Sequence, residues 1–411
     1  MNNKKLLSLG LIALSFSAAA IAAETPAPKN SYVQHNFVAN LPKYNADKVE
    51  DKFINAWGIA IRPAGAGGHF WVAAKDVSYE YIGDVTNSPD EGLRKLTTNE
   101  LEYVKVPIGG ADDNVTTGVV FSDSKDNFVI TQEIKNVEPI TAPAKFIFAS
   151  DAGTISAWTE RKKPDGKFDR SPDALRVIDE SAAGAQFFGI TLNEKYDTLY
   201  AANFGVSPGV KVYDGKFKPL PISFDQPFDT NKNGKVDAGE YAPFNVQQLK
   251  TPKGESHIFV SYAKTKECPE EEIKKSTCKK GEIFAGEEDT DKDGNGRLAE
   301  FTEAGKLVAI WPDSGKLSAP WGVAYAPGEF GALSGKLLVA NFGSGLISAF
   351  DANSRKFVDV LRDKKGEPLK IEKIWGILFG NGESLGDKNA LYFTAGPADE
   401  KEGVFGSLRA Q

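Results

Sequence analysis

Cysteine, histidine and methionine are scarce in this sequence. Its 411 residues include two cysteines, three histidines and one methionine. His35 lies in an expected N-terminal strand, and His69 and His257 each open an expected strand, so no Ser–His pairing can be argued. Two segments match G-x-S-x-G, "GVSPG" at 205–209 and "GESLG" at 382–386, but both lie between expected strands and lack the strand-to-helix context of a nucleophile elbow. "GAGG" at 65–68 likewise lacks the strand-to-helix context of a nucleotide-binding loop. The sequence therefore offers no direct motif for nucleophilic catalysis or nucleotide binding.

The two cysteines, Cys268 and Cys278, lie close together in "ECPEEEIKKSTC". In an oxidising compartment such a pair most simply forms a local disulfide that closes a surface loop. The alternative is a metal-binding or redox pair, but the spacing is too long for C-x-x-C. We expect the disulfide, within a Cys-containing acidic insertion that spans 266–300.

Long apolar runs are absent after the first residues. Residues 1–22 combine a basic start, an apolar run and a small-residue A-x-A site, which predicts a secretory signal peptide. The alternative is an anchoring helix, but the run is short of the roughly 20 residues that a span needs. We expect an exported protein, periplasmic or secreted, with a flexible segment at 23–30 and no membrane span.

Positive charge is nowhere concentrated. The formal net charge is −7, and basic and acidic residues are interspersed, whereas a protein that follows a phosphate backbone needs a basic stripe. Nucleic acid is therefore not an expected partner. We expect a monomer that binds a protein, a glycan or a small molecule.

One phrase recurs along the chain. Each copy has an aromatic residue (Thr in the second copy), then Gly (Asn in the fourth), then a β-branched residue that begins an alternating strand. The Gly or Asn positions are 58, 118, 189, 245, 322 and 376. The copies are "AWGIAI" (56–61), "TTGVVF" (116–121), "FFGITL" (187–192), "PFNVQQ" (243–248), "PWGVAY" (320–325) and "IWGILF" (374–379). Such self-similarity is typical of repeat architectures.

Further short strands rich in Val, Ile, Phe and Tyr follow most copies, separated by Gly, Asn, Asp and Pro. About four strands per repeat predict an all-β, six-bladed β-propeller over 31–411. The ring must close, and "SYVQHNFVANLP" (31–42) is expected to add an outer strand to the last blade beside "GVFGSL". The alternative is a pair of stacked smaller β domains, but no midpoint linker interrupts the repeat.

Several phrases together resemble a known family: "AWGIA", "FIFASDAGTISAW", "PWGVAYAP", "LLVANFGSGLISAFD", "IWGILFGNG" and "LYFTAGP". The chain is similar to an uncharacterised family of exported bacterial six-bladed propellers, which is related in style to NHL and SMP-30-like (gluconolactonase-type) propellers. The resemblance implies the fold over nearly the whole mature chain and implies no particular reaction. The acidic segments 229–240 and 266–296 depart from the family pattern.

"DTNKNGKVDAGE", residues 229–240, has the spacing of a calcium-binding EF-hand loop. The expected calcium ligands are the side chains of Asp229, Asn231, Asn233, Asp237 and Glu240, with the backbone carbonyl of Lys235. Gly234 permits the sharp turn, and Val236 is expected to turn inward. The flanking segments predict no helices, so a blade connection leading into the fourth blade would hold the loop. A solvated turn is the alternative, because Asp, Asn and Gly also form turns.

A second acidic string lies at 287–301, "EEDTDKDGNGRLAEF", with two competing registers. One starts at Asp289 and uses Asp291, Asp293 and Glu300. The other starts at Asp291, uses Asp293 and Asn295, and places Thr302 at the twelfth position. The first supplies more carboxylate and is preferred, and a strand pair entering the fifth blade is expected to follow. A solvated turn is again the alternative.

Propellers bind ligands at the channel mouth, where equivalent strand ends converge. "ANFG" occurs twice and places Asn203 and Asn341 at matching ends of second strands. In SMP-30-like enzymes, one metal held by carboxylate and Asn oxygens activates water. Asp76, Asp112 or Asp113 would supply the carboxylate here. The alternative is that each Asn serves a repeated turn.

Two functional hypotheses follow. The first is a non-catalytic binding or scaffold propeller stabilised by calcium; the second is a metal-dependent hydrolase, a lactonase or esterase, acting in the channel. A metal ringed by Asn203, Asn341 and a carboxylate would favour the hydrolase. A channel plugged by side chains would favour the scaffold, and the repeated Trp57, Trp321 and Trp375 are better explained by packing between blades than by ligand stacking.

Overall fold

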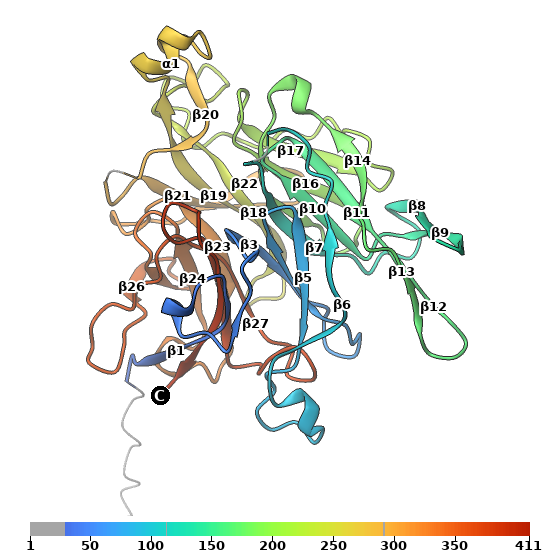
Figure 1. The fold of residues 1–411 in the computed structure, drawn as a ribbon. Coiled ribbons are helices and arrows are strands. Elements are labelled where there is room, and N and C mark those ends of the chain that lie inside the picture. The colour runs from blue at the N-terminus through green and yellow to red at the C-terminus, as the bar shows by residue number, and fades with distance from the viewer. Residues whose placement is uncertain (1–28, 112, 291) are drawn as a thin grey trace, which may run out of the picture.

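The computed structural model of the protein describes residues 29–111, 113–290 and 292–411. Within these residues, the strands form six main sheets around one axis and two further two-stranded hairpins (Figure 1). The inner strand of each sheet contacts the inner strands of the sheets on either side, so the ring is closed. The predicted all-β, six-bladed propeller is confirmed, and a pair of stacked domains is excluded. The predicted signal peptide, like residues 23–28, lies outside the described residues.

The first three blades follow one another along the chain, each starting with its inner strand. Blade 1 contains β3 (Ala56–Ala60), β4 (Phe70–Ala74), β5 (Val77–Ile82) and β6 (Thr97–Lys105). Blade 2 contains β7 (Thr116–Phe121), β10 (Phe146–Ser150), β11 (Thr154–Trp158) and β14 (Leu175–Asp179). Blade 3 contains only β15 (Phe187–Leu192), β16 (Thr198–Asn203) and β17 (Gly209–Asp214) among the described strands.

The remaining blades complete the circle. Blade 4 contains β18 (Tyr241–Lys250), β19 (Ser256–Glu267), β21 (Gly296–Phe301) and β22 (Leu307–Ile310), with β20 (Ile283–Glu288) added beside β19. Blade 5 contains β23 (Pro320–Tyr325), β24 (Lys336–Asn341), β25 (Ile347–Asp351) and β26 (Phe357–Val360). The strand pair β21–β22 therefore ends the fourth blade, whereas the sequence had predicted that it enters the fifth.

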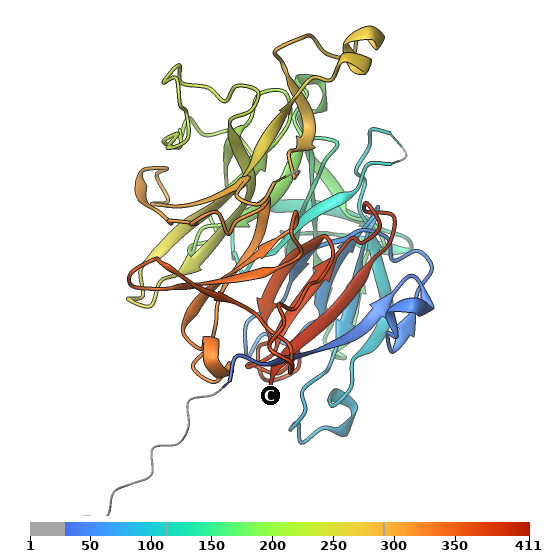
Figure 2. The ribbon, with the colours of Figure 1, turned by 90° about the vertical axis from the view of Figure 1, so that its left-hand side faces the viewer.

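Blade 6 joins the two ends of the described chain. It contains β27 (Ile374–Phe379), β28 (Leu391–Ala395) and β29 (Val404–Ala410), followed by β1 (Tyr32–Ala39) and the short β2 (Lys48–Val49). β1 pairs antiparallel with β29, from Tyr32 opposite Ala410 to Ala39 opposite Val404. Figure 2 shows this N-terminal strand beside the C-terminal strands. The predicted closure of the ring by an N-terminal outer strand is confirmed.

The repeated glycine marks the closest approach between neighbouring blades. A Cβ atom on Gly58 would lie 2.8 Å from the carbonyl oxygen of Thr117 in the next blade, and one on Gly322 would lie 2.6 Å from that of Trp375. Real Cβ atoms almost never approach backbone atoms so closely. In the fourth copy, where Asn245 replaces glycine, the side-chain amide donates to the carbonyl of Trp321 at 2.9 Å. The third position of the repeat therefore sets how tightly the ring closes.

Several additions lie outside this plan. Two hairpins, β8–β9 (Val129–Ile134, Val137–Pro143) and β12–β13 (Glu160–Lys162, Phe168–Arg170), extend from blade 2. The end of β19, helix α1 (Glu270–Lys275) and β20 project from blade 4 at the top of Figure 1. Within this projection, a disulfide joins Cys268 and Cys278, with Cα atoms 6.0 Å apart. Short 3-10 turns lie at Pro42–Tyr44, Glu91–Leu93, Ser181–Ala183 and Gly331–Leu333. Among the described residues, no helix is long and apolar enough to cross a membrane.

Candidate functional site

An aromatic cluster fills the propeller axis where the inner strands begin. Trp57 stacks on Trp375 with ring centroids 3.7 Å apart, and Phe342 stacks on Trp375 at 4.0 Å. We call this cluster the aromatic plug; it consists of Trp57, Phe188, Phe204, Phe244, Trp321, Phe342 and Trp375, with Val115 from the second blade. Because side chains from all six blades meet here, the channel is closed at this level. The repeated tryptophans pack between blades, as expected.

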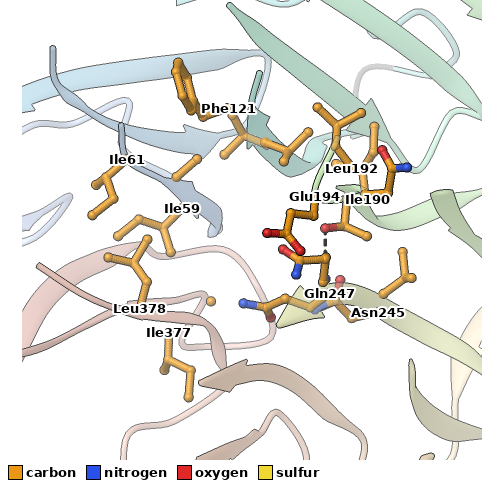
Figure 3. A pocket seen from close by; sticks show the side chains of 18 of the residues that line it. Ile59, Ile61, Phe121, Ile190, Leu192, Glu194, Asn245, Gln247, Ile377 and Leu378 are labelled. Atoms are coloured by element: carbon orange, nitrogen blue, oxygen red, sulfur yellow. Dashed lines mark hydrogen bonds between the residues drawn. The ribbon is translucent and has the colours of Figure 1, made fainter. Parts of the chain in front are cut away.

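Beyond the plug, the channel opens into a cavity of about 580 Å³, which we call the channel pocket (Figure 3). Trp321 of the plug lines it, so the plug forms its floor. Its walls are mostly branched aliphatic side chains from successive inner strands, including Ile59, Ile190 and Ile377. The channel is therefore a blind pocket that is open at one end, the form in which proteins commonly hold small molecules.

Polar groups in the channel pocket gather on blades 3 and 4. Gln247 accepts the Val323 N–H at 3.2 Å, while its own NH₂ group has no partner among the described residues. Glu194 and Lys250 form an ion pair of 2.5 Å. Glu194 and Gln247 lie on neighbouring parts of the wall in Figure 3. The pocket therefore offers one free amide donor beside a neutralised pair of charges.

Each "ANFG" asparagine joins the turn after its own strand to the segment that leads into the inner strand of the same blade. The side-chain oxygen of Asn203 accepts the N–H groups of Gln186 and Gly205 at 2.8 and 3.1 Å. Asn341 accepts the Ser318 N–H at 2.9 Å and donates to the carbonyl of Leu346 at 3.0 Å. Both are fully buried. The structure does not bring them together around a common point in the channel.

The carboxylates expected beside them are also dispersed. Asp76 is exposed in the turn between β4 and β5, and Asp113 is exposed before β7. Asp112 lies outside the described residues. Within the described residues, no group of three or more His, Cys, Asp or Glu side chains is arranged to hold a metal ion.

Three carboxyl groups, those of Asp151, Glu288 and Glu400, lie near the side of the plug that faces away from the channel pocket. Asn55 accepts from the indole N–H of Trp375 at 2.9 Å and donates to Glu400 at 2.7 Å. Burial raises the pKa of Asp151 to about 6, and burial together with the charge of Glu400 raises the pKa of Glu288 to about 8. Burial also raises the pKa of Glu400. Near neutral pH, the Glu288 carboxyl therefore holds its proton.

This proton binding predicts a stability difference that depends on pH. Between about pH 4.5 and 8, the unfolded chain has lost the Glu288 proton while the folded protein keeps it, so the stability contribution of Glu288 falls as pH rises. Glu288→Gln mimics the protonated carboxyl. We expect wild type and variant to be equally stable at pH 4.5. At pH 9 we expect the variant to be about 2 kcal/mol more stable, because solvent screens only part of the cost of the ionised carboxylate in wild type.

Urea denaturation at the two pH values measures this difference. Glu138→Gln changes an exposed glutamate on β9 and is the matched control. Equal stability of Glu288→Gln and wild type at pH 9 would contradict the raised pKa.

The 229–240 loop has its predicted ligand residues turned toward one another. Asp229 accepts the Gly234 N–H at 2.8 Å, across the turn. Asp237 accepts from the side-chain amides of Asn231 and Asn233 at 2.7 and 2.6 Å. These hydrogen bonds hold the pKa of Asp237 below its ordinary range. The loop thus gathers side-chain oxygens within about one turn of chain without flanking helices.

The end of the loop is anchored in the fold. The Glu240 carboxylate is buried and accepts the N–H groups of Thr230 and Asp237 at 2.8 and 3.1 Å. Val236 packs against the cluster that contains the aromatic plug, so it turns inward as expected. Lys235 exposes its side chain near Asp237, at 3.6 Å. The loop directly precedes β18, which is the predicted connection into the fourth blade.

The second acidic string is divided in the structure. Asp289 pairs with Lys264 at 3.4 Å, Asp293 is exposed, and Asp291 lies outside the described residues. Asn295 is buried just before β21. Glu300 lies four residues into that strand, about 13 Å further on by strand geometry.

The Glu300 carboxylate is engaged by other partners. It contacts His257 at 2.6 Å and Arg355 at 3.1 Å, and it accepts from the indole of Trp311 at 3.3 Å. The structure therefore does not bring Glu300 to the loop that begins at Asp289. Strand pairing, with Glu300 opposite Phe259, takes it away from the position that the loop spacing had suggested.

Sequence reasoning did not single out the polar wall of the channel pocket, although a signal was present. The fourth copy of the repeat reads "PFNVQQ" and places Gln247 and Gln248 where the other copies are mainly apolar. A polar break in one copy of an apolar repeat marks a position whose side chain does something other than packing. Glu288 carried no such signal, because its burial depends on contacts that the sequence does not display.

Comparison with known proteins gives relatives without a described activity. No family model matches the chain. An uncharacterised protein of Acanthamoeba polyphaga mimivirus, R648, is 25% identical over 91% of this chain and 79% of its own length. A solved structure, the soluble aldose sugar dehydrogenase from Escherichia coli in its apo form, covers 93% of this chain and 100% of that chain, with 11% identity and a TM-score of 0.45.

A second mimivirus relative shows to which family the chain belongs. The uncharacterised protein L690 is 35% identical to this sequence over 377 residues, which cover 91% of this chain and 84% of its own length. Identity at this level over nearly all of both chains implies a common fold and origin. The chain belongs to the same family as this uncharacterised mimivirus protein.

Proposed function

We propose that this protein is a non-catalytic binding propeller that holds a small amphipathic molecule in the channel pocket. The observation that supports it best is the aromatic plug, which turns an open channel into a blind apolar pocket. The hydrolase alternative required Asn203 and Asn341 as metal ligands, and their amide groups are engaged in turns within their own blades. The geometry therefore favours binding over hydrolysis.

The chemistry of the walls limits the ligand. Branched aliphatic side chains line most of the pocket, so an aliphatic chain or ring gains from burial there. The free NH₂ group of Gln247 offers a hydrogen bond to a carbonyl or carboxylate oxygen. Glu194 and Lys250 neutralise each other, so the pocket does not require a ligand with a net charge. A molecule with an aliphatic body and one oxygen acceptor fits these features.

γ-Decalactone has both parts and also tests the alternative function. We expect it to bind wild type saturably and to be recovered intact, and Gln247→Ala to weaken binding about fivefold through loss of one hydrogen bond. Ligand-observed NMR measures binding and hydrolysis together. Gln34→Ala, which changes an exposed glutamine on β1, is the control. Enzymatic hydrolysis of the lactone, or equal binding by wild type and Gln247→Ala, would contradict the proposal.

We also propose that the 229–240 loop binds calcium as a structural ion. Its donors are all oxygen, which suits a hard cation. The side chains of Asp229, Asn231, Asn233, Asp237 and Glu240 would hold the ion, with the Lys235 carbonyl. Rotation of the two Asn amides, which leaves their shape unchanged, would present oxygen instead of nitrogen toward Asp237. Bound calcium would join a surface connection to the blade that follows it.

A further inference from the structure

Blade 3 leaves one edge incompletely paired. Its outermost described strand is β17, whereas every other blade has at least four strands in the described residues. The chain that follows β17 turns back and pairs only with its end: Asp214 donates to the Lys218 carbonyl, and Leu220 donates to the Val212 carbonyl, each at 2.8 Å. Pro221 comes next, and it has no N–H with which to continue a strand.

The unpaired part of the edge is centred on Val210. In an antiparallel strand, alternate residues direct their N–H and C=O groups to the same side. Val212 and Asp214 direct theirs outward, to the 218–220 segment, and β17 pairs with β16 without a bulge, so Val210 faces outward as well. No partner for its N–H or C=O exists among the described residues. Val210 therefore presents a donor and an acceptor side by side.

A cavity of about 390 Å³ lies beside this edge. It separates β17 from the 221–228 segment, which leads to the 229–240 loop. Its walls are rich in aromatic side chains: Phe228 packs edge-on against Tyr262 with centroids 4.9 Å apart and against Tyr241 at 5.9 Å. Val210 packs against the same apolar cluster. The cavity therefore places an aromatic pocket next to a free backbone donor and acceptor.

We propose that this cavity binds an extended peptide segment of a partner protein, which pairs with Val210 and buries one aromatic or branched side chain against Phe228. A peptide backbone carries an N–H and a C=O at the spacing that Val210 presents, so one residue of the segment makes two hydrogen bonds. The side chain of a residue paired in this way lies on the same face as that of Val210. That face is where the aromatic walls are.

The test compares two small probes. N-acetyl-phenylalanine methylamide carries one aromatic residue with its N–H and C=O, and O-acetyl-phenyllactic acid methylamide replaces that N–H by an ester oxygen. We expect the amide to bind saturably and the ester about fivefold more weakly, since one hydrogen bond is lost. We also expect the amide probe to shift the ¹⁵N–¹H signal of Val210 downfield. Equal binding of the two probes, or an unchanged Val210 signal at saturation, would overturn backbone pairing.

Variants locate the site. Phe228→Ala removes part of the aromatic wall, and we expect it to weaken binding of the amide probe about tenfold or more. Phe357→Ala truncates another partly buried phenylalanine, on β26 of blade 5, and should leave the affinity unchanged. Equal affinities in both variants would place the probe elsewhere and refute the proposal. If Phe228→Ala does not fold, the Val210 signal and the two probes on wild type still decide the question.

Discussion

Gly58→Ala is expected to lower the free energy of unfolding by about 3 kcal/mol, a cost typical of forcing an extra methyl group into a packed core. The added Cβ would lie 2.8 Å from both the Thr117 carbonyl oxygen and the Val119 backbone nitrogen of the next blade. Backbone atoms of an inner strand cannot move aside without disturbing the following blade. Relief of the clash must therefore widen the ring.

The control is a glycine with open space around it. Gly328 has no atom within 4 Å of an added Cβ, and its φ lies outside the left-handed region. Gly328→Ala should leave stability unchanged or raise it by about 0.5 kcal/mol, through a less flexible unfolded chain. Urea midpoints of both variants give the comparison. If Gly58→Ala unfolds at the midpoint of Gly328→Ala, the close approach of the inner strands is not what holds the ring.

Calcium is expected to stabilise the protein by about 2.7 kcal/mol when its concentration is a hundred times the dissociation constant. A chelator should therefore lower the melting temperature of wild type by several degrees. Glu240→Gln keeps the shape of the buried side chain but removes its charge, so it should abolish both the calcium-dependent rise and the effect of the chelator. Thermal unfolding with calcium and with chelator, together with metal content, measures this.

Glu255→Gln changes an exposed glutamate near the start of β19 and should respond to calcium as wild type does. A chelator that destabilises Glu240→Gln as much as wild type would show that the stabilising ion lies elsewhere. Bound calcium in Glu240→Gln with an unchanged melting temperature would point to a second site and separate the ion from stability.

The parts of the fold that the sequence predicted are those carried by local, repeated patterns. The inner-strand phrase located all six blades, because each copy must satisfy the same close approach and the same central packing. The outer position of 31–42 followed from the need to close a ring, which is a topological requirement and not a local preference. The inward turn of Val236 followed from the spacing of a known loop.

The parts that could not be predicted depend on contacts between distant segments. Glu300 matched the twelfth position of a calcium loop, but pairing between β19 and β21 carries it to His257 and Arg355. Asn203 and Asn341 matched a channel ligand pattern, but each accepts an N–H from the segment that precedes the inner strand of its own blade, from Gln186 and Ser318 respectively. Burial, and then the charge of Glu400, more than a hundred residues away, raise the pKa of Glu288. Spacing along the chain does not encode such partners.

The antiparallel pairing of β1 with β29 has a mechanical consequence. Tyr32 is opposite Ala410, so the two ends of the described chain leave the strand pair at the same end. A force that separates them would load one pair of residues at a time and peel the strands apart like a zipper, instead of loading the whole ladder at once. The ring should therefore resist tension between its two ends poorly. A machine that pulls on either end would open the propeller at blade 6 first.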